Sequence, residues 1–146
     1  MVFTYDTELA LATAAALVNT GSQEPDPLAD DAGLTRFLAQ ERFSGSRSHT
    51  PSELRAVHRL RTDLAAMWTA GEEDLVEGIN RLLLGAKALP QLVRHDGWDW
   101  HLHCTPPEAE PADRMATAAA MALAAVVRAG ELARLRTCAA PDWSNA

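Results

Sequence analysis

The stretch TPSELRAVHRLRTDLAAM, residues 50–67, decides the fold class, because it predicts a long amphipathic helix with a defined start. Thr50 can cap this helix, Pro51 suits its first turn, and Glu53 completes a capping box. Apolar residues then recur at helical spacing: Leu54, Val57, Leu60, Leu64 and Met67. Because such a stripe has to be buried against other helices, the stretch predicts a helical bundle.

Further helices are predicted on both sides of this stretch. Residues 9–18 are rich in alanine, and the helix is expected to end at residues 19–21, where Gly21 can adopt a left-handed cap. Asp30 or Asp31 can cap a short helix over residues 31–38. Acidic residues 72–74 suit the start of a helix that ends at Gly85. Half of residues 112–129 are alanine, so another backbone can approach this last helix closely.

Between residues 91 and 104 the pattern changes and predicts a β-hairpin. Asp96-Gly97 suits the positive φ angles of a type I′ turn. A two-residue loop sets the cross-strand pairs: His95 with Trp98, Val93 with Trp100, Gln91 with Leu102, and Arg94 with Asp99 on the opposite face. The sequence thus predicts a mainly α (α+β) fold, a helical bundle with one β-hairpin around residues 91–104.

Composition limits the class of protein without naming a function. The chain has 146 residues, enough for one domain, and a formal charge of −7, which disfavours binding to a phosphate backbone. Its two cysteines, Cys104 and Cys138, cannot build a disulfide framework. With no signal peptide or membrane span recognisable, we expect a cytoplasmic protein that contacts neither a membrane nor, through this chain alone, DNA.

The strongest local hint of chemistry is the alternation of Asp99, His101 and His103, which places three potential metal ligands on one face of a strand. A complete site would need ligands from elsewhere. We therefore favour a solvent-facing hairpin with Asp99 held by Arg94, and we expect no bound metal or cofactor. Cys104 is expected to be a buried, inert thiol. A small metal-dependent enzyme using His101 and His103 stays an alternative.

Two other groups of residues could bind a ligand. The cations of residues 55–61, Arg55 and Arg61 among them, could hold an anion, although a solvated face paired with acids is the favoured interpretation. Trp68, Trp98 and Trp100 are expected in the core and could also line an apolar pocket. Since no phosphate-binding loop, His-Glu-x-x-His, nucleophile elbow or Cys-x-x-Cys motif is found, we expect no enzyme.

Four segments resemble, in order and spacing, the ABATE domain of CGNR zinc-finger transcription regulators. These are AALVNT at 15–20, ELRAVHRLR at 53–61, INRLL at 79–83 and AGELARLRTC at 129–138. Ala16 departs from the pattern, which commonly has aspartate there. The resemblance implies a bacterial, stress-responsive regulator whose helical domain senses a ligand and whose C-terminal finger binds DNA.

On this resemblance we expect residues 1–137 to form the ligand-sensing domain and residues 138–146 to be an incomplete start of the finger. Cys138 matches its first zinc ligand, but Trp143 stands where a second cysteine is expected. We therefore expect the DNA-binding finger to be absent from this chain. The effector would be an unknown small molecule.

The residue patterns and the family resemblance together give six candidate ligand-binding residues: Asn19, Arg55, Arg61, Trp68, Trp98 and Trp100. Asn19 could equally be a helix cap. The alternative function is a helical dimerisation module that forms a homodimer through the alanine-rich helix and needs no ligand.

Overall fold

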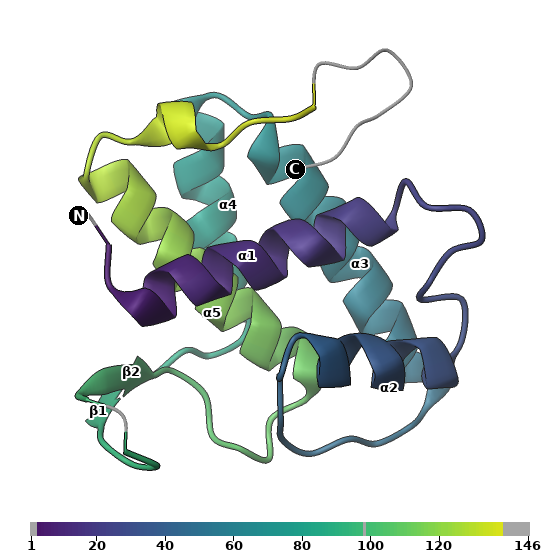
Figure 1. Ribbon diagram of the computed structural model, residues 1–146. Coiled ribbons are helices and arrows are strands. Elements are labelled where there is room, and N and C mark those ends of the chain that lie inside the picture. The colour runs from purple at the N-terminus through teal and green to yellow at the C-terminus, as the bar shows by residue number, and fades with distance from the viewer. Residues whose placement is uncertain (1–2, 98, 139–146) are drawn as a thin grey trace.

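The computed structural model describes residues 3–97 and 99–138, and within them it confirms a mainly α fold with one small hairpin (Figure 1). The helices are α1 (Tyr5–Thr20), α2 (Asp31–Gln40), α3 (Pro51–Trp68), α4 (Glu72–Gly85) and α5 (Pro111–Arg128), followed by the short 3-10 helix η1 (Leu132–Arg134). Strands β1 (Gln91–Val93) and β2 (His101–His103) lie between α4 and α5. None of the described helices is long and apolar enough to cross a membrane.

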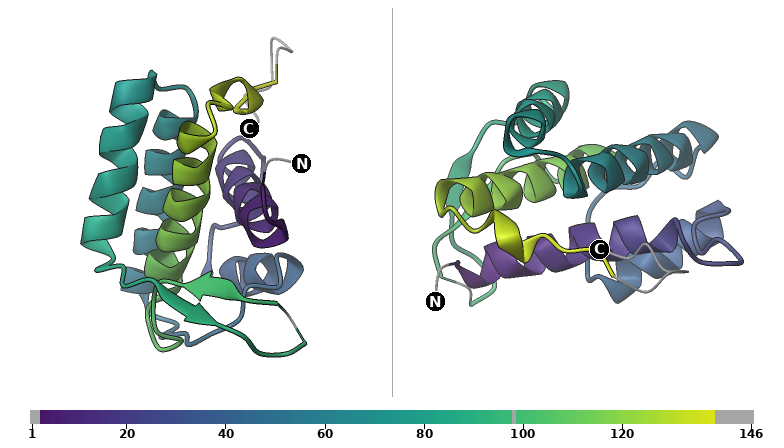
Figure 2. Two further views of the ribbon diagram at one scale, coloured as in Figure 1. Left: turned by 90° about the vertical axis from the view of Figure 1, so that its left-hand side faces the viewer. Right: turned by 90° about the horizontal axis from the view of Figure 1, so that it is seen from above.

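Helix α5 is the centre of the bundle. It packs against α1 on one side and α4 on the other, and it also contacts α3 (Figure 2). Its buried face is rich in alanine: Ala112, Ala116, Ala119, Ala120 and Ala122. These small side chains let neighbouring helices approach closely, as the composition of this segment predicts. The contacts within the chain therefore use much of the alanine surface that the homodimer alternative invokes.

Helix α3 begins as predicted, with one difference at Glu53. The Thr50 Oγ1 accepts a hydrogen bond from the Glu53 amide at 3.2 Å, and Pro51 occupies the first turn. Most of the predicted stripe is buried, and Leu54 is half-buried. The Glu53 carboxylate, however, accepts from the Ser48 amide at 2.6 Å, so a loop residue takes the place of Thr50 in the predicted capping box.

The ends of the first two helices also test the sequence rules. Asp30 caps α2 by accepting from the Gly33 amide at 2.8 Å, as predicted. Gly21 was expected to be left-handed, and this is wrong: its φ is −68°. Its amide donates to the Val18 carbonyl at 3.0 Å, which closes α1 with an ordinary right-handed turn.

The hairpin forms, but its predicted register is wrong by one residue. The observed partners are Gln91 with His103, Leu92 with Leu102, and Val93 with His101. Asp96 and Gly97 do have positive φ angles, 54° and 75°. The loop is longer than two residues because Asp99 bonds locally: its carboxylate accepts from the Trp100 amide and its carbonyl from the His101 ring.

A shift of one residue exchanges the two faces of a strand. Leu92 and Leu102 therefore pair on an outer face, where they are 62% and 47% exposed, rather than in a core. Arg94 was expected to pair with Asp99, and instead its guanidinium lies 5.0 Å from the centre of the Trp100 ring. Cys104 is buried as expected, and burial raises the pKa of its thiol.

A buried hydroxyl in α5 leads to a stability prediction. Among the described residues, Thr117 has the only fully buried side-chain polar atom without a hydrogen-bond partner. We expect Thr117→Val to raise the free energy of unfolding by about 1 kcal/mol, because it removes an unsatisfied hydroxyl and keeps the shape. Thr20→Val is the matched control and should be destabilising, because the Thr20 hydroxyl donates to the Leu17 carbonyl at 2.6 Å. Urea unfolding of both variants measures this; a loss of stability in Thr117→Val would contradict it.

Candidate functional site

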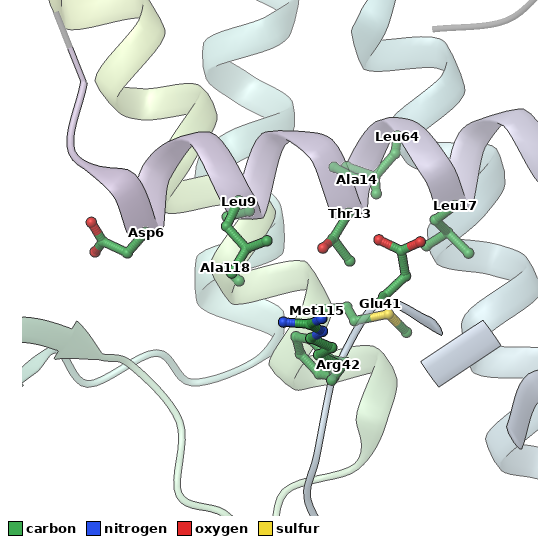
Figure 3. A pocket seen from close by; sticks show the side chains of 12 residues that line it. Asp6, Leu9, Thr13, Ala14, Leu17, Glu41, Arg42, Leu64, Met115 and Ala118 are labelled. Carbon is green, nitrogen blue, oxygen red and sulfur yellow. The ribbon is translucent and has the colours of Figure 1, made fainter. Parts of the chain in front are cut away.

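A cavity of about 170 Å³ lies between α1, α5 and the end of α2. Figure 3 shows Leu9, Thr13 and Leu17 of α1 directed toward Met115 and Ala118 of α5. Apolar side chains from α3 and the loop after α2, Leu64 and Phe43, complete the lining. The lining is thus mostly apolar, which suits a small apolar ligand or an apolar part of a larger one.

Charged groups lie at the edge of this cavity: Asp6, Glu41 and Arg42. The backbone at the end of α2 places Arg42 there. The amide of Phe43 donates to the Leu38 carbonyl at 2.8 Å, and the Arg42 amide to the Ala39 carbonyl at 3.2 Å. This is a Schellman-type helix end, in which Arg42 adopts a φ of 53°, a conformation more usual for glycine.

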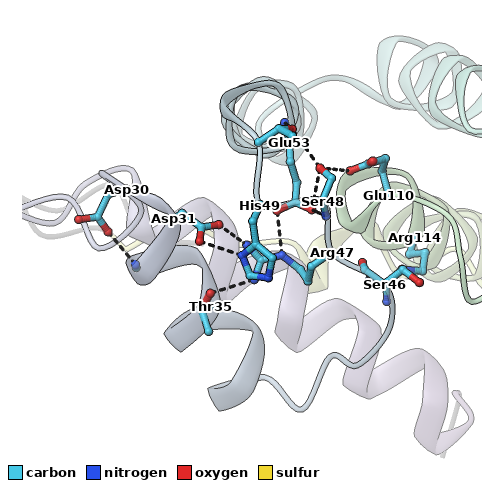
Figure 4. A network of polar contacts seen from close by, with 12 residues as sticks. Asp30, Asp31, Thr35, Ser46, Arg47, Ser48, His49, Glu53, Glu110 and Arg114 are labelled. Carbon is cyan, nitrogen blue, oxygen red and sulfur yellow. Dashed lines mark hydrogen bonds and ion pairs between the residues drawn. The ribbon is translucent and has the colours of Figure 1, made fainter.

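A polar network joins α2, the following loop and α3 (Figure 4). Arg47 is at its centre and donates to Asp31 at 2.6 Å, to Glu53 at 2.8 Å and to the Thr35 hydroxyl at 3.0 Å. The His49 ring bonds the other Asp31 oxygen at 2.8 Å. His49, together with Arg47, holds the pKa of Asp31 below its ordinary value of 3.8.

The same network reaches α5 through Arg114, which donates to the carbonyls of Ser44, Ser46 and Ala109. Its guanidinium also lies 5.1 Å from the Phe43 ring centre. Because the strong donors and acceptors of the network are used within the chain, we interpret it as a structural clamp. The sequence pattern does not single out Arg47, and its only signal is a cation shortly before a buried helix start.

The hairpin brings three imidazoles together: His95, His101 and His103. Their Nε2 atoms are 3.2 Å apart for His101–His103 and 3.3 Å apart for each of the two pairs with His95. Burial, together with the charges of His101 and His95, lowers the pKa of His103. The sequence identifies His101 and His103 as potential ligands, but the predicted register places His95 on the opposite face, and this is wrong. Asp99, the third predicted ligand, is not in the cluster.

A family model described as "Putative stress-induced transcription regulator", ABATE, matches residues 11–130. The chain belongs to the ABATE family. The match confirms the resemblance to the ABATE domain, and it spans α2, α3, α4, the hairpin, α5 and most of α1. No curated protein matches the chain.

In this ABATE domain the predicted cationic residues lie apart from the cavity. Arg61 makes a two-pronged ion pair with Asp26, at 2.9 and 3.0 Å, and also donates to Thr20 at 3.3 Å. Its hydrogen bond and charge hold the pKa of Asp26 below 3.8. Arg55 is exposed on α3, and Asn19 lies in the last turn of α1, where its carbonyl accepts from Ser22.

Trp68 and Trp100, the two described tryptophans of the prediction, are also separated in the ABATE domain. Trp68 is 9% exposed, donates to the Arg136 carbonyl at 3.2 Å, and lines a second cavity of about 280 Å³ with Leu132 and Leu135. Trp100 is 58% exposed on the hairpin, and Trp98 lies outside the described residues. None of the five described candidates lines the cavity between α1 and α5.

Proposed function

We propose that this ABATE domain is the effector-binding part of a transcription regulator and that the effector occupies the cavity between α1 and α5. The observation that carries the proposal is a mostly apolar cavity built on α5, the helix that leads to the C-terminal segment. The role is binding without catalysis. Because the formal charge of the chain is −7, we expect the DNA contacts to come from another part of the regulator, such as a CGNR-type zinc finger.

The size of the cavity limits the effector. Engineered cavities of about 150 Å³ lined by leucine and phenylalanine bind benzene. A cavity of about 170 Å³ therefore suits a body the size of one aromatic ring or a short branched chain. A polar group on such a ligand would lie near Asp6, Glu41 or Arg42 at the edge.

The position of the cavity suggests how binding could be transmitted. Met115 and Ala118 line it from α5, and the chain leads from the end of this helix through Gly130 into η1. The segment after η1 is held to the bundle by the hydrogen bond from Trp68 to Arg136. A ligand that shifts α5 would therefore bias the C-terminal segment, provided that it binds one position of α5 better than another.

Filling the cavity is expected to abolish binding. Three single-ring probes differ in charge: benzyl alcohol, benzoate and benzylamine. At least one should raise the melting temperature of the native chain by several degrees, since a ligand at about 100 times its Kd adds roughly 2.7 kcal/mol. Ala118→Leu should remove that shift, because the larger side chain occupies the cavity. Differential scanning fluorimetry measures this.

The matched control is Ala65→Leu, the same change at an exposed position of α3, which should keep the shift. Hydrogen exchange in α5 should also slow when the probe is bound. If no probe shifts the native chain, or if both variants keep the shift, the cavity is not an effector site.

A homodimer through a surface other than the alanine-rich helix is favoured by one observation, the exposed leucines at the end of α4, in the segment after it and on the hairpin. They are Leu84, Leu89, Leu92 and Leu102, between 47% and 80% exposed. Exposed apolar surface of this kind is common at protein interfaces. Sedimentation analysis of the chain separates the two functions: a dimer without probe binding supports a dimerisation module.

A further inference from the structure

We infer that the hairpin is a zinc-binding site whose three protein ligands are the Nε2 atoms of His95, His101 and His103. The inference does not rest on the effector cavity, which is lined by other residues. It rests on the distances between the three imidazoles, on the partners of the second nitrogens of His95 and His101, and on the position of the cluster in the hairpin.

The distances match a tetrahedral ion. Zinc binds histidine nitrogens at about 2.0–2.1 Å, so two ligands of a tetrahedral site lie roughly 3.3–3.4 Å apart, and two neighbouring ligands of an octahedral site roughly 2.8–3.0 Å apart. The three observed Nε2–Nε2 distances are 3.2, 3.3 and 3.3 Å. The three Nε2 atoms thus have the spacing of one face of a ligand tetrahedron with a zinc ion at its centre.

The hydrogen bonds of the second nitrogens direct lone pairs into this cluster. His95 Nδ1 lies 2.7 Å from the Asp96 carboxylate, and His101 Nδ1 lies 2.8 Å from the Asp99 carbonyl. Both partners are acceptors, so a neutral ring must carry its proton on Nδ1 and a lone pair on Nε2. Two lone pairs facing each other at 3.3 Å repel unless a cation lies between them.

The same hydrogen bonds are those of a zinc-bound histidine. Metal-ligating imidazoles usually donate their other N–H to a carboxylate or a backbone carbonyl, which fixes the tautomer and the ring orientation. Asp96 supplies such a carboxylate for His95, and the Asp99 carbonyl serves His101. The same local bonds of Asp99 that change the register therefore also orient the His101 imidazole.

A bound zinc ion would also stabilise the hairpin. Each strand has three residues, and an isolated two-stranded hairpin is at best marginally stable. Zinc would join the loop after β1, through His95, to both ends of β2. No fourth histidine, cysteine or carboxylate of the described residues joins the cluster, so the fourth position would hold water or an exchangeable small ligand.

Zinc titration of the full chain without an affinity tag tests the site. We expect binding of one Zn²⁺ per chain in isothermal titration calorimetry. In His101→Ala the affinity for Zn²⁺ should fall by a factor of about 100 or more. Asp96→Asn should weaken binding roughly 10-fold, since it changes only the partner of His95. Co²⁺ in place of Zn²⁺ should give the intense visible absorption of a four-coordinate ion, and hydrogen exchange in the hairpin should slow.

His49→Ala is the matched control, because it removes an exposed histidine that is bonded to Asp31 and lies outside the cluster. It should leave zinc affinity unchanged. The hairpin ligands are largely exposed, so circular dichroism should show all variants to be as helical as the native chain. The inference is overturned if the native chain binds zinc no better than the His95→Ala/His101→Ala/His103→Ala variant, if His49→Ala weakens binding equally, or if bound Co²⁺ is six-coordinate.

Discussion

Replacing Glu53 with glutamine is expected to lower the free energy of unfolding by about 3 kcal/mol at neutral pH, as for other broken buried ion pairs. The Glu53 side chain is 1% exposed, and its carboxylate accepts from Arg47 at 2.8 Å and from the Ser48 amide at 2.6 Å. Glutamine keeps the size but removes the charge and turns one acceptor into a donor. Arg47, 12% exposed, then lacks its buried counter-charge. Urea unfolding followed by circular dichroism measures the loss.

The effect should depend on pH in one direction. Burial by itself raises the pKa of Glu53, but the Ser48 amide and Arg47 together hold the pKa of this carboxyl below its ordinary value of 4.5. A carboxyl with a lowered pKa stabilises the fold above the unfolded-state pKa, and this stability is lost as the pH falls through the folded-state value. The difference in the free energy of unfolding between the native chain and Glu53→Gln should therefore have its full value above pH 4.5 and decrease below it.

Glu110→Gln is the matched control for this prediction. Glu110 is exposed at the edge of the same network, where the Ser48 hydroxyl reaches it at 3.5 Å. The same chemical change should cost less than about 0.5 kcal/mol there. Equal losses in the two variants, or a loss at Glu53 that does not change with pH, would show that the buried ion pair does not clamp the fold.

The error at Glu53 shows how far local rules reach. Thr50, Pro51 and Glu53 predict a helix start from spacing alone, and the helix does start there. Which group the Glu53 carboxylate accepts from depends on the path of the loop before the helix, and that path has no periodicity to read. Arg47 lies in this loop, so its role appears only when the loop is folded against α2 and α3.

The hairpin shows the same limit in a sharper form. Its place in the chain and the positive φ angles of Asp96 and Gly97 follow from residue types. Its register does not, because the local hydrogen bonds of Asp99 lengthen the loop. A shift of one residue in the register decides which face a side chain occupies. The predicted register therefore places His95 on the face opposite to the two histidines with which it forms the cluster.

The cavity could not be predicted from the sequence for a different reason. Leu9 and Ala118 both line it, although more than a hundred residues separate them. Helical periodicity identifies the buried face of each helix. It does not say which helices cross or where their side chains fail to fill the space between them. The family resemblance predicts a sensing domain, and only the packing of α1 on α5 provides the candidate site.

Gly33 is held in a position that leaves no room for a side chain. It lies in the first turn of α2, and a Cβ there would overlap the carbonyl oxygen of Pro27. This carbonyl group cannot easily move away, because the residues before and after it are held in place. Asp26 is paired with Arg61, and Leu28 is fully buried, with its own carbonyl bonded to the His58 ring at 2.7 Å.

We therefore expect Gly33→Ala to lower the free energy of unfolding by about 2–3 kcal/mol, the upper part of the range for overpacked sites. Helix propensity alone predicts the opposite sign, a gain of roughly 1 kcal/mol for alanine over glycine. Gly85→Ala is the matched control: Gly85 is the last residue of α4, with open space around the position of its Cβ, so stability should be unchanged or slightly higher. Thermal and urea unfolding of both variants measure the sign of each change in the free energy of unfolding. If Gly33→Ala is as stable as Gly85→Ala, the turn at Pro27 yields, and the packing of residues 26–28 against α2 and α3 does not constrain the start of α2.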